Sequence, residues 1–87
     1  MKDIELKVLV SPGCHTCHAF EEFWRSVEKD WLHVTFIKVD VTSPEGQELA
    51  QTHMIFASPG IILNGTLFAT GGFDREKFLA ELKKLSS

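Results

Sequence analysis

The sequence has few cysteines and no long hydrophobic run. It has only two cysteines in 87 residues, three prolines and no tyrosine. Two cysteines cannot build the disulfide framework of a small secreted domain, and no apolar run approaches the length of a membrane span, about 20 residues. Charged residues also interrupt positions 1–7, where a secretory signal needs an unbroken apolar stretch. We therefore expect a cytoplasmic protein that makes no membrane contact.

Long runs of one charge are absent as well. Nine lysines and arginines stand against twelve aspartates and glutamates, which gives a formal net charge of −3. Because no basic run is long enough to follow a phosphate backbone, we expect no nucleic-acid partner. Hydrophobic residues, at 44%, are as frequent as in ordinary globular proteins and exclude a disordered chain. Residues 1–87 are thus expected to form a single domain with its own core, and we expect a monomer.

Apolar residues recur at spacings typical of alternating strands and helices. After Thr16 they recur at three- and four-residue steps, which predicts an amphipathic helix, and Asn64-Gly65 favours a tight hairpin turn between two strands. The expected elements are strands at 4–10, 34–41, 61–63 and 66–69, and helices from 16 to about 31, from 44 to about 53, and after Asp74. Helices between strands favour parallel crossovers, and the hairpin adds antiparallel pairing. The prediction is an α/β fold in the order β-α-β-α-β-β-α, with a four-stranded mixed sheet and helices on both faces.

The two cysteines lie in Cys14-His15-Thr16-Cys17, where the first strand ends and the first helix begins. Residues three apart in a first helical turn have Cα atoms about 5 Å apart, within the range that a disulfide tolerates. At the helix amino terminus, free N–H groups and the helix dipole favour a thiolate at Cys14. Cys17, one turn inside, is expected to be more buried and to react second. The motif predicts a reversible dithiol/disulfide pair that needs no metal or organic cofactor.

Together with a second segment, this motif resembles the thioredoxin-like superfamily along nearly the whole chain, between the thioredoxins and the glutaredoxins. Ala57-Ser58-Pro59-Gly60 stands at the start of the third strand, where the family carries a cis proline that faces the active site. The resemblance implies a thioredoxin-like fold, and it implies that the backbone of Ser58 pairs with an extended substrate peptide. The implied activity is thiol–disulfide exchange with protein disulfides, with a reductase or glutathione as electron source.

Other positions match one branch of the superfamily and not the other. Thioredoxins bury an Asp six residues before the first cysteine, where this chain has Val8, whereas Lys38 resembles the thioredoxin lysine near that Asp. Gly71-Gly72-Phe73-Asp74 resembles the segment with which glutaredoxins hold glutathione, though the two glycines also suit a plain tight turn before a helix. His15 and Thr16 replace the residues usual in either branch, and His15 is either a solvated loop residue or a cation beside the first thiolate. We expect a reductase or partner protein as electron source, and glutathione second.

Other interpretations of the cysteine motif stay open. With His18 the motif also spells Cys-x-x-Cys-His, the attachment signature of c-type haem, with Met54 as the candidate second ligand. Zinc is another alternative, with the ligands Cys14, Cys17, His18 and one of His15, His33 or His53. Two further alternatives are that the cysteines are buried and inert, or that they serve a small redox-sensing or metal-binding adaptor without turnover. The β-rich context disfavours haem, and the lack of a second closely spaced pair disfavours zinc.

Overall fold

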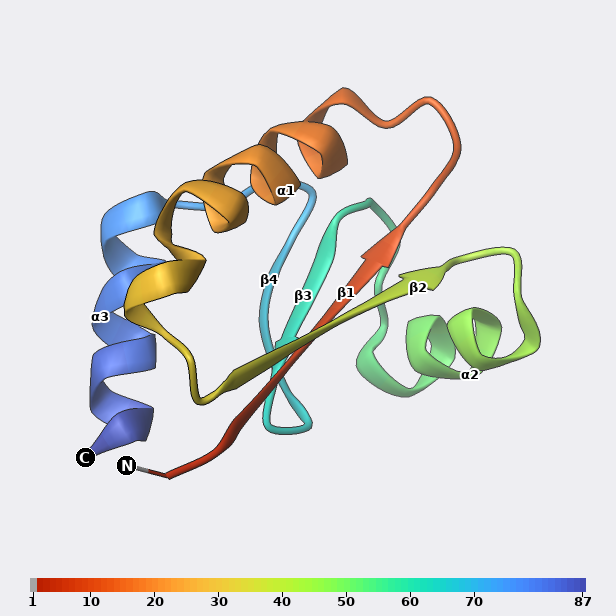
Figure 1. The fold of residues 1–87 in the computed structure, drawn as a ribbon. Coiled ribbons are helices and arrows are strands. Elements are labelled where there is room, and N and C mark those ends of the chain that lie inside the picture. Colours follow the sequence, from red (N-terminus) through yellow and green to blue (C-terminus); the bar gives the residue numbers. More distant parts are fainter. Residues whose placement is uncertain (1) are drawn as a thin grey trace.

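The computed structural model describes residues 2–87 and has the predicted order of strands and helices (Figure 1). Within these residues, no helix is both long and apolar enough to cross a membrane. The elements are β1 (Ile4–Val10), α1 (His15–Val27), a 3₁₀ turn (Glu28–Asp30), β2 (Val34–Asp40), α2 (Pro44–His53), β3 (Gly60–Leu63), β4 (Thr66–Thr70) and α3 (Arg75–Ser86).

Helix α1 is shorter than its apolar periodicity predicts. It ends at Val27, and the chain continues as a 3₁₀ turn instead of extending the α-helix to Trp31. Because a 3₁₀ helix has about three residues per turn, it also brings Trp31 back to the core, where it is half-buried. The chain then reverses, and the N–H of Val34 donates to the carbonyl oxygen of Trp31 as β2 begins. Apolar spacing does not distinguish the two kinds of helix here.

The four strands form one mixed sheet in the order β2-β1-β3-β4. β1 pairs in parallel with β2, whereas the β1–β3 and β3–β4 pairs are antiparallel. The β3–β4 hairpin turns at Asn64 and Gly65, whose φ angles of 51° and 80° are positive, as the Asn-Gly pair predicts. The Asn64 side chain also accepts a hydrogen bond from the backbone N–H of Glu5 at 2.8 Å, which ties the turn to β1.

Helices cover both faces of the sheet (Figure 1). α1 and α3 lie on one face over an aromatic core, and α2 lies on the other face over a smaller aliphatic core. β1 contributes to both cores because successive side chains of a strand point to opposite faces. Leu6 and Val8 join the first core, and Leu9 joins the second. The predicted mixed sheet with helices on both faces is confirmed, and its aromatic core contains Phe20, Phe23, Trp24 and Phe78.

The sheet brings two loops together at one of its ends. β3 runs antiparallel to β1, and Gly60 at the start of β3 pairs with Leu9 near the end of β1. The loop that leaves β1 and leads into α1 therefore lies beside the loop that leads into β3. The first loop ends at Cys14, and the second contains Ser58 and Pro59. The fold thus places the cysteine motif and the proline segment next to each other.

Candidate active site

Cys14 and Cys17 form a disulfide at the amino terminus of α1, with Cα atoms 5.3 Å apart. Cys14 is the N-cap residue, and its sulfur accepts a hydrogen bond from the backbone N–H of Cys17 at 3.1 Å. Cys14 is half-buried in this oxidised molecule, whereas only 7% of Cys17 is exposed. Of the two residues, Cys14 is the more accessible to a substrate.

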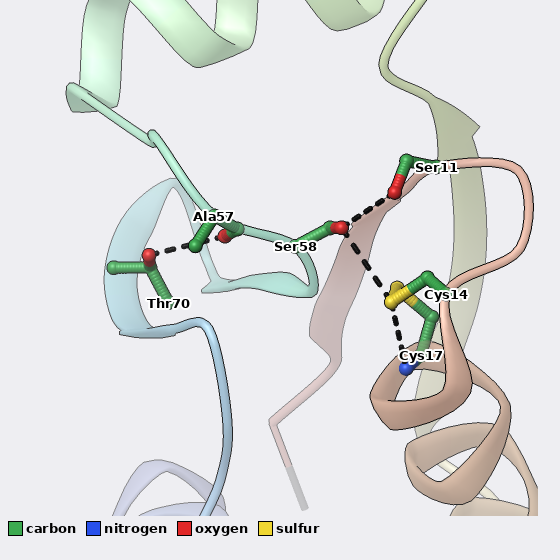
Figure 2. Close-up of a disulfide and its surroundings, with 6 residues drawn as sticks. All are labelled: Ser11, Cys14, Cys17, Ala57, Ser58 and Thr70. Carbon is green, nitrogen blue, oxygen red and sulfur yellow. Dashed lines mark hydrogen bonds between the residues drawn. A yellow bond between two sulfur atoms is a disulfide. The ribbon is translucent and has the colours of Figure 1, made fainter.

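The Ser58-Pro59 segment lies opposite Cys14 (Figure 2). Its peptide bond is cis, and Pro59 is fully buried. The Oγ atom of Ser58 lies 3.5 Å from Cys14 Sγ and 2.6 Å from the Oγ atom of Ser11, which is in the loop after β1. The two segments that carry the family resemblance therefore meet in space. Ser11 joins them and was not expected from the sequence.

Hydrogen bonds from the end of β4 hold the proline loop in place. Thr70 Oγ1 donates to the carbonyl oxygen of Ala57 at 3.1 Å, and the backbone N–H of Gly71 donates to the carbonyl oxygen of Pro59 at 3.0 Å. Gly71 has a φ of +80°, a conformation that side chains rarely adopt. Gly72 is half-buried, with open space where a Cβ atom would lie. The segment expected to hold glutathione thus lies beside the proline loop, with one of its N–H groups already engaged.

A lysine–carboxylate pair lies one helical turn beyond Cys17. Lys38 Nζ, from β2, lies 3.0 Å from Glu21 Oε1 on α1. The hydrogen bond from Lys38 lowers the pKa of Glu21, and burial opposes this shift only in part. Val8 is paired with Lys38 in the sheet and is buried, so the carboxylate near the cysteines comes from α1 and not from β1. The sequence signal for Glu21 is its position four residues after Cys17, on the same helix face.

These side chains surround an open hollow of about 440 Å³ beside the disulfide. Both cysteines, Glu21 and Lys38 line it, and so does His15, which is exposed. Sites for small molecules usually enclose most of the ligand surface. A hollow this open would enclose little of the surface of a small ligand.

Some of the side chains considered as metal or haem ligands lie near the cysteines and others do not, because His15 and His18 line the same hollow as Cys14 and Cys17. His18 Nε2 lies 2.6 Å from Glu22 Oε1, one turn further along α1, and His33 Nε2 lies 2.6 Å from Ser86 Oγ. Met54 is 68% exposed at the end of α2, the helix on the opposite face of the sheet from α1. Among residues 2–87, no three His, Cys, Asp or Glu side chains are grouped to hold a metal ion. His33 and Met54 lie away from the hollow that the two cysteines line.

Solved structures of thioredoxins are similar to this chain over almost its whole length. Oxidised thioredoxin O2 from Arabidopsis thaliana matches with a TM-score of 0.75 and 16% identity, over 99% of this chain and 77% of that one. Thioredoxin f2 from Chlamydomonas reinhardtii matches with a TM-score of 0.72 and 20% identity, over 98% and 82%. A chain in the complex of ferredoxin:thioredoxin reductase with thioredoxin f2 matches with a TM-score of 0.75 and 16% identity, over 99% and 80%. At these identities, the likeness shows the fold.

The family is shown by the sequence itself. No curated protein sequence matches the chain. The family profile described as "Thioredoxin domain" matches residues 4–84, which span every strand and nearly all of α3. With the fold and the helix-terminal disulfide also in place, the chain belongs to the thioredoxin domain family.

Proposed function

We propose that this protein is a thiol–disulfide oxidoreductase that exchanges its Cys14–Cys17 pair with disulfides in other proteins. One observation carries the proposal: the disulfide lies at the amino terminus of a helix, beside an open hollow and opposite the Ser58-Pro59 loop. The helix terminus favours the thiolate that attacks. The loop offers a backbone surface to the substrate, and the second cysteine releases the product.

The reaction follows from the two positions in the helix. In the direction that reduces a substrate, the Cys14 thiolate attacks one sulfur of the substrate disulfide, a new S–S bond to Cys14 forms, and the displaced substrate thiolate takes up a proton. Cys17 then loses its proton and attacks Cys14 Sγ, which closes the Cys14–Cys17 bond and releases the second substrate thiol. Two electrons pass from the chain to the substrate. A dithiol donor returns them by the reverse exchange and is itself oxidised.

The surroundings of the disulfide suit an extended protein segment. The carbonyl oxygens on either side of Ser58 accept hydrogen bonds from the end of β4, whereas within residues 2–87 no hydrogen bond occupies the backbone groups of Ser58 itself. A peptide that adds as a strand pairs with such free groups. Phe56, two residues earlier, is 88% exposed and offers apolar surface beside them.

A protein reductase ranks first as electron source. The structural match to a chain in a thioredoxin–reductase complex supports a protein partner for this chain. Glutathione ranks second, because the N–H of Gly71 is engaged by Pro59, and Asp74 accepts the N–H of Lys77 as the cap of α3. Fewer backbone donors remain there for an anionic peptide. The net charge of −3 adds no long-range attraction for it.

We propose further that the chain acts as a monomer in the cytoplasm and needs no metal or organic cofactor. The two sulfur atoms hold both electrons of the exchange. A reducing compartment keeps the attacking thiolate available between cycles.

The test follows reduction of a disulfide-bonded protein by this chain, which is regenerated either by a thioredoxin reductase or by glutathione. We expect faster turnover with the reductase, and we expect Cys17→Ser to accumulate mixed disulfides with the substrate. Gly72→Val is the informative variant for glutathione, because its side chain enters open space, whereas Gly71→Val would strain the backbone. Faster turnover with glutathione that Gly72→Val abolishes would reverse the ranking. Absence of exchange with either donor would overturn the function.

A further inference from the structure

Two serine hydroxyls from distant loops meet beside the sulfur of Cys14 (Figure 2). Ser11 follows β1 and Ser58 precedes β3, 47 residues later, yet their Oγ atoms lie 2.6 Å apart. Ser58 Oγ also lies 3.5 Å from Cys14 Sγ, within hydrogen-bonding distance for sulfur. Both serines are half-buried, and partial shielding from water strengthens a hydrogen bond.

The number of hydrogen atoms on the two hydroxyl groups decides which atom donates in each hydrogen bond. A serine hydroxyl has one hydrogen and two acceptor lone pairs, whereas the sulfur of a disulfide or a thiolate only accepts. When the hydrogen of Ser58 points to Cys14, the Ser58 oxygen must accept the hydrogen of Ser11. The bonds then run in one direction, from Ser11 to Ser58 to Cys14, and each donor polarises the next.

The strength of the last bond depends on the state of Cys14. A disulfide sulfur is a weak acceptor, but a thiolate is charged, and a hydrogen bond to a charged group is roughly twice as strong as a neutral one. The backbone N–H of Cys17 donates to the same sulfur at 3.1 Å. Ser58 supplies a second donor from a different segment of the chain. The two donors together favour the thiolate over both the thiol and the disulfide.

We propose that Ser11 and Ser58 form a hydroxyl relay that stabilises the Cys14 thiolate and thereby sets the reactivity and reduction potential of the active-site disulfide. The relay rests on the proposed function, because a stabilised thiolate serves the protein only if Cys14 reacts with disulfides. Its test does not depend on that function, because the Cys14 thiol titrates without any substrate. Ser58 positions the donor at the sulfur, and Ser11 acts through Ser58. Neither serine gains or loses a proton or an electron in the exchange.

The test measures the rate at which iodoacetamide alkylates Cys14 as a function of pH. Each serine variant is prepared in the reduced, full-length Cys17→Ser protein, so that Cys14 is the only thiol. At pH values below the titration midpoint of Cys14, we expect Ser58→Ala to lower the fraction of Cys14 present as thiolate by about tenfold, because a hydrogen bond to a charged group is lost. Ser11→Ala is expected to lower it by about twofold. Ser58→Thr, which keeps the hydroxyl, is expected to restore it.

The double variant separates a relay from two independent contacts. If Ser11 acts only through Ser58, Ser11→Ala adds nothing in a Ser58→Ala background. Ser26→Ala is the matched control, because the Ser26 hydroxyl bonds to Phe23 within α1 and lies outside the hollow beside the disulfide. In proteins with both cysteines, Ser58→Ala is also expected to shift the reduction potential to a more negative value, since the reduced form loses stabilisation.

Two results would overturn the relay. One is an unchanged Cys14 titration in Ser58→Ala, and the other is a Ser11→Ala effect that adds fully to that of Ser58→Ala. Circular dichroism of each variant identifies a loss of fold, and Ser58→Thr then carries the test through retention of the wild-type titration. Failure of the proposed function gives a different result. In that case Cys14 titrates as described, but neither the thioredoxin reductase nor glutathione supports turnover.

Discussion

Helices α1 and α2 begin in the same way but with different acceptor atoms. In α2 the hydroxyl oxygen of Ser43 accepts a hydrogen bond from the backbone N–H of Gly46 at 3.0 Å. In α1 the sulfur of Cys14 accepts the equivalent bond from Cys17 at 3.1 Å. The first turn of α2 also carries Glu45, whose charge suits the helix dipole, whereas the first turn of α1 has no acidic residue.

The difference separates a helix start that serves stability from one that serves chemistry. In α2, a hydroxyl and a carboxylate permanently satisfy the positive end of the helix. In α1, the same N–H groups and the same dipole act on a sulfur whose charge changes with its redox state. A negatively charged side chain in that turn would disfavour the thiolate form of Cys14 by charge repulsion. The same N-cap hydrogen bond and helix dipole therefore serve stability in α2 and chemistry in α1. The acceptor atom, oxygen in α2 and sulfur in α1, makes the difference.

The largest effect is expected from making α1 begin as α2 does. Cys14→Ser keeps an N-cap acceptor and removes the nucleophile, so turnover of a disulfide-bonded protein should fall to background. Cys14→Ala removes both, so urea unfolding should show it about 1 kcal/mol less stable than Cys14→Ser. Full turnover in Cys14→Ser would show that Cys14 is not the attacking sulfur. Equal stability of the two variants would show that the cap does not stabilise α1.

Removing the cap of α2 should affect stability alone. We expect Ser43→Ala to lower the free energy of unfolding by about 1 kcal/mol, because the N–H of Gly46 loses its acceptor. Turnover should be unchanged, since α2 lies on the opposite face of the sheet from the disulfide helix. Ser43→Thr, which keeps the hydroxyl, is the control. A marked loss of turnover in folded Ser43→Ala would contradict the division between the two helix starts.

Placing an acidic residue in the first turn of α1 should make the thiolate form of Cys14 less stable relative to the thiol. We expect His15→Glu to raise the pH at which Cys14 is half ionised by about half a unit, from the usual strength of a charge at a helix terminus. Alkylation rates across pH measure this value. His15→Gln is the matched control, and it also tests whether His15 contributes as a cation. No change in His15→Glu would mean that a charge in the first turn of α1 does not act on this sulfur.

The smallest effect is expected in the first turn of α2, where Glu45 pairs with Lys7 at 3.0 Å. The hydrogen bond from Lys7 to Glu45 raises the pKa of Lys7, and burial opposes this shift. A raised lysine pKa stabilises the fold below the unfolded value of about 10.4, and this stabilisation is lost as the pH rises. We expect Glu45→Gln to be about 0.5 kcal/mol less stable at pH 7. In urea unfolding at several pH values, the difference should shrink above about pH 10.4, and a constant difference would exclude the ion pair as its source.

The sequence predicts the parts of this molecule that local chemistry decides. Ser43-Pro44 marks the start of α2, Asn64-Gly65 marks the hairpin, and the cysteine spacing predicts a pair at the start of α1. Each signal depends on the backbone preferences of neighbouring residues, so no knowledge of the rest of the chain is needed. The order of strands and helices follows from these signals together with the apolar spacing.

Contacts between distant segments cannot be predicted from the preferences of neighbouring residues. Ser11 and Ser58 are 47 residues apart, and Lys38 and Glu21 are 17 residues apart, so only the packed sheet and helix bring them together. The family resemblance indicated Ser58 and Lys38 but not their partners. The end of α1 was wrong in the sequence prediction because the apolar step to Trp31 suits a 3₁₀ turn as well as an α-helix.

The split origin of the active site has a consequence for synthesis of the protein. Cys14 precedes Ser58 by 44 residues, which on a ribosome that adds roughly 5–20 residues per second is a delay of several seconds. During that delay both thiols have left the polymerising centre, while the loop that faces them and the strand that carries it do not yet exist. The growing chain therefore contains both cysteines before it contains the loop that faces them. Selectivity for a substrate begins only when β3 pairs with β1 and brings Ser58 opposite Cys14.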